Sequence, residues 1–184
     1  MLNNVVEIAQ IYMRLSIKKG ATVLDATCGN GYDTVLLSDL TGISGKVLAF
    51  DVQQVAISRT EERLKKNNCC DNVRLICDSH DHLADYTDSI SFAVFNLGYL
   101  PNSDKSVTTK ACATLRAVKT AISILTPGGL IVICCYLGHP GGAEEYESLV
   151  AELNHYDCDR YNIVLLKHLI RHEDAPRIIL IEKK

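Results

Sequence analysis

The sequence predicts an α/β fold in which a mostly parallel β-sheet lies between two layers of helices. Apolar segments of strand length alternate along the chain with segments that repeat apolar residues at helical spacing. A glycine turn, Gly29-Asn30-Gly31, joins the first predicted strand to a helix, and Asp51 ends the next strand about twenty residues later. Strand, glycine turn, helix and acidic strand end, in this order, are typical of a Rossmann-like sheet that binds a nucleotide-like ligand.

The first half of the chain predicts three helices and three strands in alternation. Residues 4–18 carry apolar side chains at helical spacing, and Gly20 follows as a helix stop. The next segments are a buried strand at 22–26, a helix at 32–40, a strand at 47–51, a helix at 54–67 and a strand at 73–77.

The second half completes the sheet and closes it with a hairpin. A fourth strand at 90–97 precedes a long helix at 108–125, which Thr126-Pro127-Gly128-Gly129 ends with strong breaker residues. The remaining segments are a strand at 130–136, a helix at 144–153 and two hairpin strands at 162–169 and 177–182. This order predicts the seven-stranded class I methyltransferase plan, mostly parallel with a C-terminal antiparallel hairpin, in one domain over residues 1–184.

Composition is that of an ordinary globular protein. The 184 residues are 47% hydrophobic and 22% charged, with a net charge of −3. No apolar run approaches the ~20 residues that span a bilayer, and the N-terminus lacks signal-peptide features, so we expect a cytoplasmic protein without membrane association. Local basic clusters permit RNA binding without requiring it, and the oligomeric state, monomer or homodimer, stays open.

The eight cysteines predict neither disulfides nor a metal site. There is no Cys-x-x-Cys pair, and the adjacent Cys134 and Cys135 should point to opposite faces of a strand. His80 and His82 have a metal-like spacing, but no third ligand is evident. We therefore expect reduced, structural thiols and no metal.

The composition of the glycine loop indicates which cofactor it binds. A dinucleotide fingerprint requires a third small residue, and Thr34 stands there instead. Asp25 and Asp33 add negative charge where a pyrophosphate would lie, whereas they would attract the cationic methionine end of S-adenosylmethionine. The sequence therefore favours S-adenosylmethionine, with a nicotinamide-dependent oxidoreductase as the alternative.

Ligands of open α/β sheets gather at the carboxyl ends of the strands, and this rule selects the candidate cofactor contacts. Asp51 would accept hydrogen bonds from the ribose hydroxyls, and Ser79 and His80 would contact the adenosine end. The full set of candidates is Asp25, Thr27, Asn30, Gly31, Asp33, Thr34, Asp51, Gln53, Asp78, Ser79, His80 and Asn96.

Asn96, Tyr99 and His139 are the candidate catalytic residues. Asn96-Leu97-Gly98-Tyr99 ends the fourth strand, where the asparagine oxygen could accept an N–H of an amine and the tyrosine could stack on a base. The alternative explanation of these four residues is a polar strand end followed by a turn. His139 lies in the loop after the fifth strand and could remove a proton or cap a backbone group.

Several segments together resemble a small bacterial family of YtqB type, long labelled rRNA methylases. They are residues 25–34 (DATCGNGYDT), 49–53 (AFDVQ), 79–81 (SHD), 95–101 (FNLGYLP), 104–109 (DKSVTT) and 138–142 (GHPGG). The resemblance implies N-methylation of 5-aminomethyl-2-thiouridine at the tRNA wobble position, with the anticodon stem-loop as partner. It implies cofactor contacts at Thr27 or Asn30, Asp51, Gln53, Ser79 and His80, and a substrate-side Asn96 and Tyr99, with Lys105 in the matching DKS segment. An rRNA or a small-molecule amine as substrate, or a binding module without catalysis, remains an alternative.

Overall fold

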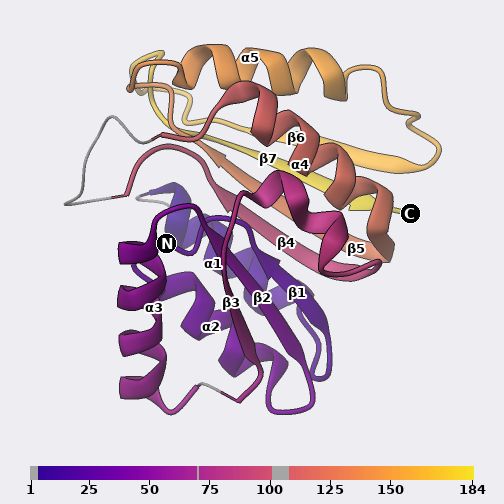
Figure 1. Cartoon of the computed structure of the whole chain (residues 1–184). Coiled ribbons are helices and arrows are strands. Elements are labelled where there is room, and N and C mark those ends of the chain that lie inside the picture. The colour runs from indigo at the N-terminus through magenta and orange to yellow at the C-terminus, as the bar shows by residue number, and fades with distance from the viewer. Residues whose placement is uncertain (1–3, 70, 101–107) are drawn as a thin grey trace.

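The computed structural model describes residues 4–69, 71–100 and 108–184, and its strands form one seven-stranded sheet (Figure 1). The spatial order is β3-β2-β1-β4-β5-β7-β6, with β1 to β5 parallel and β7 antiparallel to both of its neighbours. The strands are β1 (Thr22–Asp25), β2 (Lys46–Asp51), β3 (Val73–Cys77), β4 (Ile90–Asn96), β5 (Leu125–Cys135), β6 (Tyr161–Leu166) and β7 (Arg177–Lys183). The predicted fold class is confirmed.

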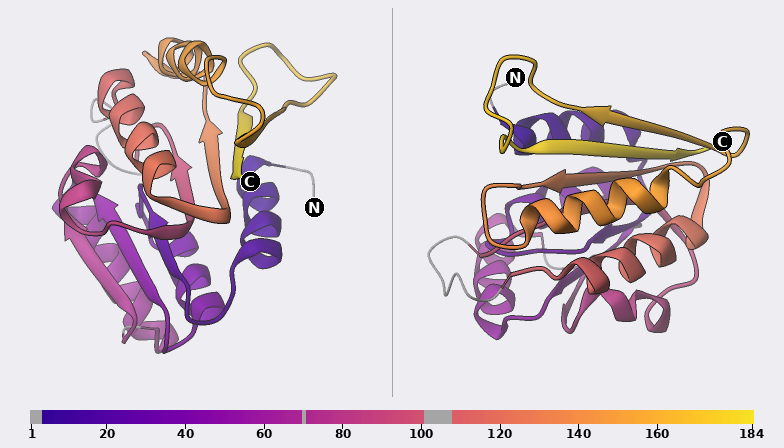
Figure 2. Two further views of the ribbon diagram at one scale, coloured as in Figure 1. Left: turned by 90° about the vertical axis from the view of Figure 1, so that its right-hand side faces the viewer. Right: turned by 90° about the horizontal axis from the view of Figure 1, so that it is seen from above.

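Helices cover both faces of this sheet (Figure 2). On one face lie α1 (Val5–Ser16), α2 (Tyr32–Thr41) and α3 (Gln54–Asn67), and on the other lie the 3₁₀ helix η1 (His80–Asp85), α4 (Ala111–Ile124) and α5 (Gly142–Leu153). No helix in the described part of the chain has the length and apolar character needed to cross a membrane.

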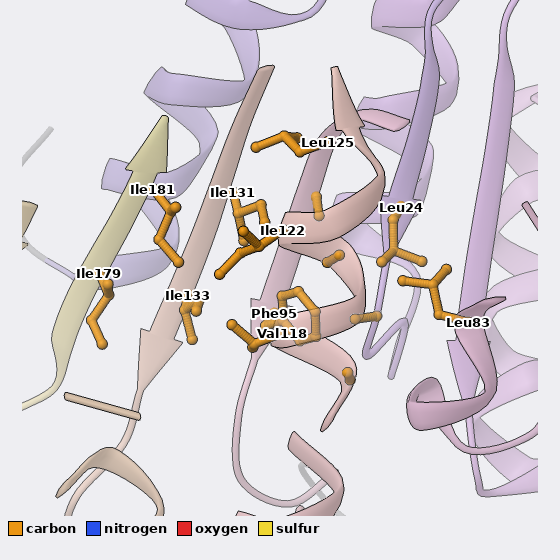
Figure 3. Close-up of a cluster of buried hydrophobic side chains, with 14 of the residues drawn as sticks. Leu24, Leu83, Phe95, Val118, Ile122, Leu125, Ile131, Ile133, Ile179 and Ile181 are labelled. Atoms are coloured by element: carbon orange, nitrogen blue, oxygen red, sulfur yellow. The ribbon is translucent and has the colours of Figure 1, made fainter. Parts of the chain in front are cut away.

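Two hydrophobic clusters fill the space between the layers. In the larger one, Phe95 of β4 packs with Val118 and Ile122 of α4, beside strand residues from β1, β5 and β7 (Figure 3). The other joins α1 and α2 to the opposite sheet face. Cys134 belongs to the second cluster and Cys135 to the first, so the predicted alternation is confirmed. The cysteines that the structure describes are free thiols.

The predicted breaker after α4 is a bulge within β5. Ile90 pairs with Leu125 and Phe92 with Leu130, so five steps along β5 match two along β4. Gly128 has a φ of +73°, a conformation that glycine adopts without strain. The expected helix at 108–125 begins only at Ala111, because Thr108 pairs with Tyr99 in an isolated bridge. The 3₁₀ helix η1 was not predicted, because residues 80–85 carry no helical repeat of apolar side chains.

The topology determines where a ligand could enter. The chain runs from β1 to β2 and β3 on one side, and then returns to place β4 on the other side of β1. The loops after β1 and β4 therefore leave the sheet in opposite directions, and a crevice forms at their carboxyl ends.

Candidate cofactor and substrate site

The glycine loop after β1 is a tight turn that requires both of its glycines. Gly29 and Gly31 have φ values of +54° and +79°, and the N–H of Gly31 donates to the Cys28 carbonyl at 2.7 Å. A Cβ on Gly31 would lie 2.9 Å from Cα of Thr60. Gly31 thus lets the loop pack closely against α3.

Side chains of α3 hold this loop from behind. Arg63 donates from Nε to the Asn30 carbonyl at 2.6 Å, and its guanidinium lies 3.6 Å from the ring centroid of Tyr32. Thr60 donates its hydroxyl to the Gly29 carbonyl at 3.2 Å. Arg63 therefore supports the loop.

Asp51 lies at the end of β2, facing the loop. Its Oδ2 accepts from the Gly29 N–H at 3.1 Å and its Oδ1 from the Gln53 N–H at 2.9 Å. Burial raises the pKa of Asp51, while these two N–H groups lower it. Each carboxylate oxygen retains a lone pair for a ligand hydroxyl.

Asp25 is fully buried beneath the loop and supports it. It accepts from the Thr34 hydroxyl at 2.6 Å and from the Thr27 N–H at 3.3 Å. Burial, with a smaller contribution from nearby Asp33, raises the pKa of Asp25 to about 7. Asp25, Gly31 and Thr34 were expected among the cofactor contacts, but none of them lines the cavity at the ends of the strands.

A cavity of about 860 Å³ opens at the carboxyl ends of the strands. The other candidates all line it: Thr27, Asn30, Asp33, Asp51, Gln53, Asp78, Ser79, His80, Asn96, Tyr99 and His139. Val6 of α1, Lys110 before α4, and Asp174 and Pro176 from the β6–β7 loop also line it, and sequence reasoning missed them. Val6, Asp174 and Pro176 do not follow a parallel strand, and Lys110 comes at the far end of the loop after β4, so the strand-end rule did not select them. Lys105 lies outside the described residues.

Asn96 is held from two directions at the end of β4. Its backbone N–H donates to the Thr27 hydroxyl at 2.7 Å, and its Nδ2 donates to Oδ2 of Asp33 at 2.8 Å. Its Oδ1 is buried without a hydrogen-bond partner among the described residues. An acceptor left in this way usually meets a ligand or a water molecule.

His139 and Tyr99 also line the cavity, with ring centroids 6.2 Å apart at an interplanar angle of 89°. Nδ1 of His139 lies 3.0 Å from the Pro140 carbonyl, which only accepts, so the neutral ring carries its proton on Nδ1. Nε2 is then an acceptor, and it is buried without a partner in the described part of the chain. A Cβ on Gly142 would lie 2.9 Å from this atom, so glycine leaves room for the ring.

The residues directly after β3 also line the cavity. His80 has Nδ1 at 3.1 Å from the Ala26 carbonyl, and its Nε2 is buried without a partner among the described residues. Burial lowers the pKa of His80, so the ring is neutral and Nε2 accepts. His82 turns instead to Asp78, with Nδ1 at 2.9 Å from Oδ1, so the two histidines have different partners.

A buried glutamate anchors the turn after β4. Glu145 of α5 accepts from the hydroxyls of Thr109 at 2.8 Å and Thr114 at 2.5 Å. The Thr109 hydroxyl also accepts from the Gly98 N–H at 2.9 Å. This network fixes Gly98, beside Tyr99, to α4 and α5, and sequence reasoning missed it.

Comparison with known proteins identifies the family of this chain. The model of the family described as "Putative rRNA methylase" matches residues 47–182. The chain belongs to this family. The resemblance drawn from the sequence motifs is thereby confirmed.

Individual relatives match most or all of this rRNA methylase family member. A protein from Clostridium thermocellum, solved as a "putative rRNA-methylase", is 35% identical with a TM-score of 0.96, and the match covers 100% of both chains. A "putative methyltransferase" from Streptococcus mutans, solved in complex with SAH, is 35% identical with a TM-score of 0.89 over 100% of both chains.

One plant relative has a specific name. The Arabidopsis thaliana "tRNA (mnm(5)s(2)U34)-methyltransferase, chloroplastic" is 40% identical over 156 residues, which cover 79% of this chain and 57% of the relative. The chain thus spans little more than half of that protein's length.

Proposed function

We propose that this family member is an S-adenosylmethionine-dependent RNA methyltransferase. Its proposed reaction is N-methylation of 5-aminomethyl-2-thiouridine at the tRNA wobble position to 5-methylaminomethyl-2-thiouridine. The observation that carries the proposal is Oδ1 of Asn96, a buried acceptor without a partner among the described residues that lines the cavity beside Tyr99. The name of the Arabidopsis relative supports this choice of nucleoside.

The residues of the cavity fit S-adenosylmethionine. Gly29 lets backbone approach a ligand, Asp51 offers acceptors for ribose hydroxyls, and Nε2 of His80 is a buried acceptor without a partner among the described residues. Asp33 adds a carboxylate that favours a cationic group. When bound, S-adenosylmethionine supplies an electrophilic methyl group on a positively charged sulfur.

The chain's own contribution is to hold a neutral amine in line with the methyl–sulfur bond that breaks. An aliphatic amine is mostly protonated at neutral pH, so it must lose a proton before its lone pair can attack. Oδ1 of Asn96 would accept one remaining N–H and orient the nitrogen. Nε2 of His139 is an acceptor at the same cavity and could take the released proton. Tyr99, which is 40% exposed, would stack on the base.

The proposed partner is the tRNA anticodon stem-loop, whose phosphates Lys110 at the cavity could meet. The description of the family model favours rRNA as the second candidate substrate. A cytoplasmic location, as expected from the sequence, stays a prediction, since the plant relative is named as chloroplastic.

The decisive experiment incubates the protein with labelled S-adenosylmethionine and tRNA that lacks only the terminal methyl group, followed by nucleoside mass spectrometry. We expect 5-aminomethyl-2-thiouridine to gain one methyl. Asn96→Ala should lower kcat by about 100-fold with cofactor affinity nearly unchanged, because the lost acceptor serves the amine. Asn162→Ala, an exposed position on β6, is the matched control.

Two results would contradict the proposal. Methylation of rRNA but not of this tRNA would transfer the activity to the second substrate. A parallel loss of kcat and cofactor affinity in Asn96→Ala would show that Asn96 does not act on the substrate side.

A further inference from the structure

Helix α1 reaches the site, although no motif of the sequence analysis includes it. Its apolar side chains Val5, Ala9 and Met13 are buried against the sheet. The neighbouring Gln10 is half-buried and donates from Nε2 to Oδ1 of Asp33 at 2.9 Å. The first helix of the chain is thus connected to the first turn of α2.

The other oxygen of the same carboxylate contacts Asn96. Oδ2 of Asp33 accepts from Nδ2 of Asn96 at 2.8 Å, so one carboxylate lies between two side-chain amides. An ionised carboxylate only accepts hydrogen bonds, and both amides must therefore turn their NH₂ groups toward it. As a result the amide oxygen of Asn96 faces away from Asp33, at the cavity and without a partner among the described residues.

We propose that Gln10 is a positioning residue for the substrate amine: through Asp33 it fixes the amide of Asn96 so that Oδ1 points to the cavity. The site then selects a methyl-accepting group that can donate an N–H hydrogen bond to this oxygen. This inference rests on the proposed function, since it assigns the Asn96 oxygen to the amine.

The arrangement depends on the charge of Asp33. Burial raises the pKa of Asp33, and the hydrogen bonds from Gln10 and Asn96 lower it. In the described part of the chain, the titratable groups that interact electrostatically with Asp33 are Asp25 of β1, Cys134 of β5 and Tyr136 directly after β5, and none of these is a cation. Gln10 and Asn96 are therefore the described side chains whose hydrogen bonds favour the ionised form of Asp33.

Loss of Gln10 should shift the protonation equilibrium of Asp33 toward the neutral acid. The pKa of Asp33 would rise further, and a protonated Asp33 would present an O–H donor. Asn96 could then turn its oxygen toward Asp33 and its amino group toward the cavity, so the acceptor for the amine would be lost. Activity should thus fall as pH drops through the pKa of Asp33, and it should fall at higher pH in the variant.

The test compares Gln10→Ala with Arg14→Ala, an exposed position on the same helix. In Gln10→Ala we expect the acidic limb of the kcat/KM profile on tRNA to move up by about one pH unit. On this limb kcat/KM at a given pH should fall by up to about 10-fold, while affinity for S-adenosylhomocysteine in calorimetry stays within about twofold. Arg14→Ala should leave the profile unchanged. A uniform loss of activity with the acidic limb unmoved would overturn the inference.

A second readout needs no substrate. The side-chain amide signals of Asn96, assigned in ¹⁵N NMR by their absence in Asn96→Ala, should shift with pH as Asp33 titrates. The midpoint should be higher in Gln10→Ala than in the wild type or in Arg14→Ala, and equal midpoints would overturn the link between the three residues. If the wild type methylates no amine, the proposed function fails, while this titration still decides whether Gln10 acts through Asp33.

Discussion

At the scale of single residues, Asp25 is the unusual group, because it is a fully buried carboxylate whose described partners are all neutral. Since burial raises its pKa to about 7, the folded protein holds a proton there that the unfolded chain has released. Between about pH 4 and 7 the folded state binds more protons than the unfolded one, so this residue reduces stability as pH rises.

The variant Asp25→Asn tests this predicted decrease of stability with rising pH. Asparagine can accept from the Thr27 N–H and donate to the Thr34 hydroxyl, so both hydrogen bonds are retained. Between pH 5 and pH 8 the wild type should lose on the order of 1–3 kcal/mol of unfolding free energy relative to the variant, measured by urea denaturation. If the two proteins keep a constant difference across this range, Asp25 does not titrate as described.

At the scale of elements, α3 is the support of the glycine loop. Arg63 bonds the Asn30 carbonyl and covers the Tyr32 ring, and both of these residues line the cavity. Arg63→Ala should therefore weaken binding of S-adenosylhomocysteine by about tenfold and lower the unfolding free energy by about 1–2 kcal/mol. Calorimetry and denaturation measure these two effects.

Lys66→Ala is the matched control, because Lys66 is an exposed cation on the same helix. It should leave both quantities nearly unchanged. If Lys66→Ala weakened binding as much as Arg63→Ala, the general positive charge of α3 would be the cause and not the support of the loop.

Element types were predictable from the sequence wherever one periodic pattern dominated. The helix at 54–67 and the strand at 73–77 have the predicted bounds, because their apolar positions follow a single period between clear ends. The start of β5 was not predictable. Pro127 and the glycines that follow it are typical of a turn, but pairing of Leu125 with Ile90 keeps this segment in the sheet as a bulge.

At the scale of the whole molecule, the sheet order explains which parts of the site the sequence could predict. Strand ends converge in any sheet of this kind, so Asp51, His80 and Asn96 could be selected without coordinates. Gln10 could not, because its contact with Asp33 depends on how α1 lies against α2. The same holds for Asp174, which arrives from the hairpin loop between two antiparallel strands.

A ligand that bridges the ends of β1, β2 and β4 should stabilise the whole sheet. S-adenosylhomocysteine at about 100 times its Kd would add about 2.7 kcal/mol to the free energy of unfolding. For a chain of 184 residues this corresponds to a rise in Tm of about 5–10 °C, measured by calorimetry or fluorescence.

Two variants and a second ligand test whether this rise in Tm comes from binding at the cavity. Asp51→Ala should lose most of the rise, because the carboxylate would hold the ribose and also accepts the Gly29 N–H of the loop. Asn162→Ala should retain it, since that side chain is exposed on β6 and does not line the cavity. NAD⁺ should produce no rise, because Asp33 and Asp51 line the cavity beside the loop and place carboxylates where its pyrophosphate would lie. A larger rise with NAD⁺ than with S-adenosylhomocysteine would contradict the assignment of the cofactor and favour the nicotinamide-dependent alternative.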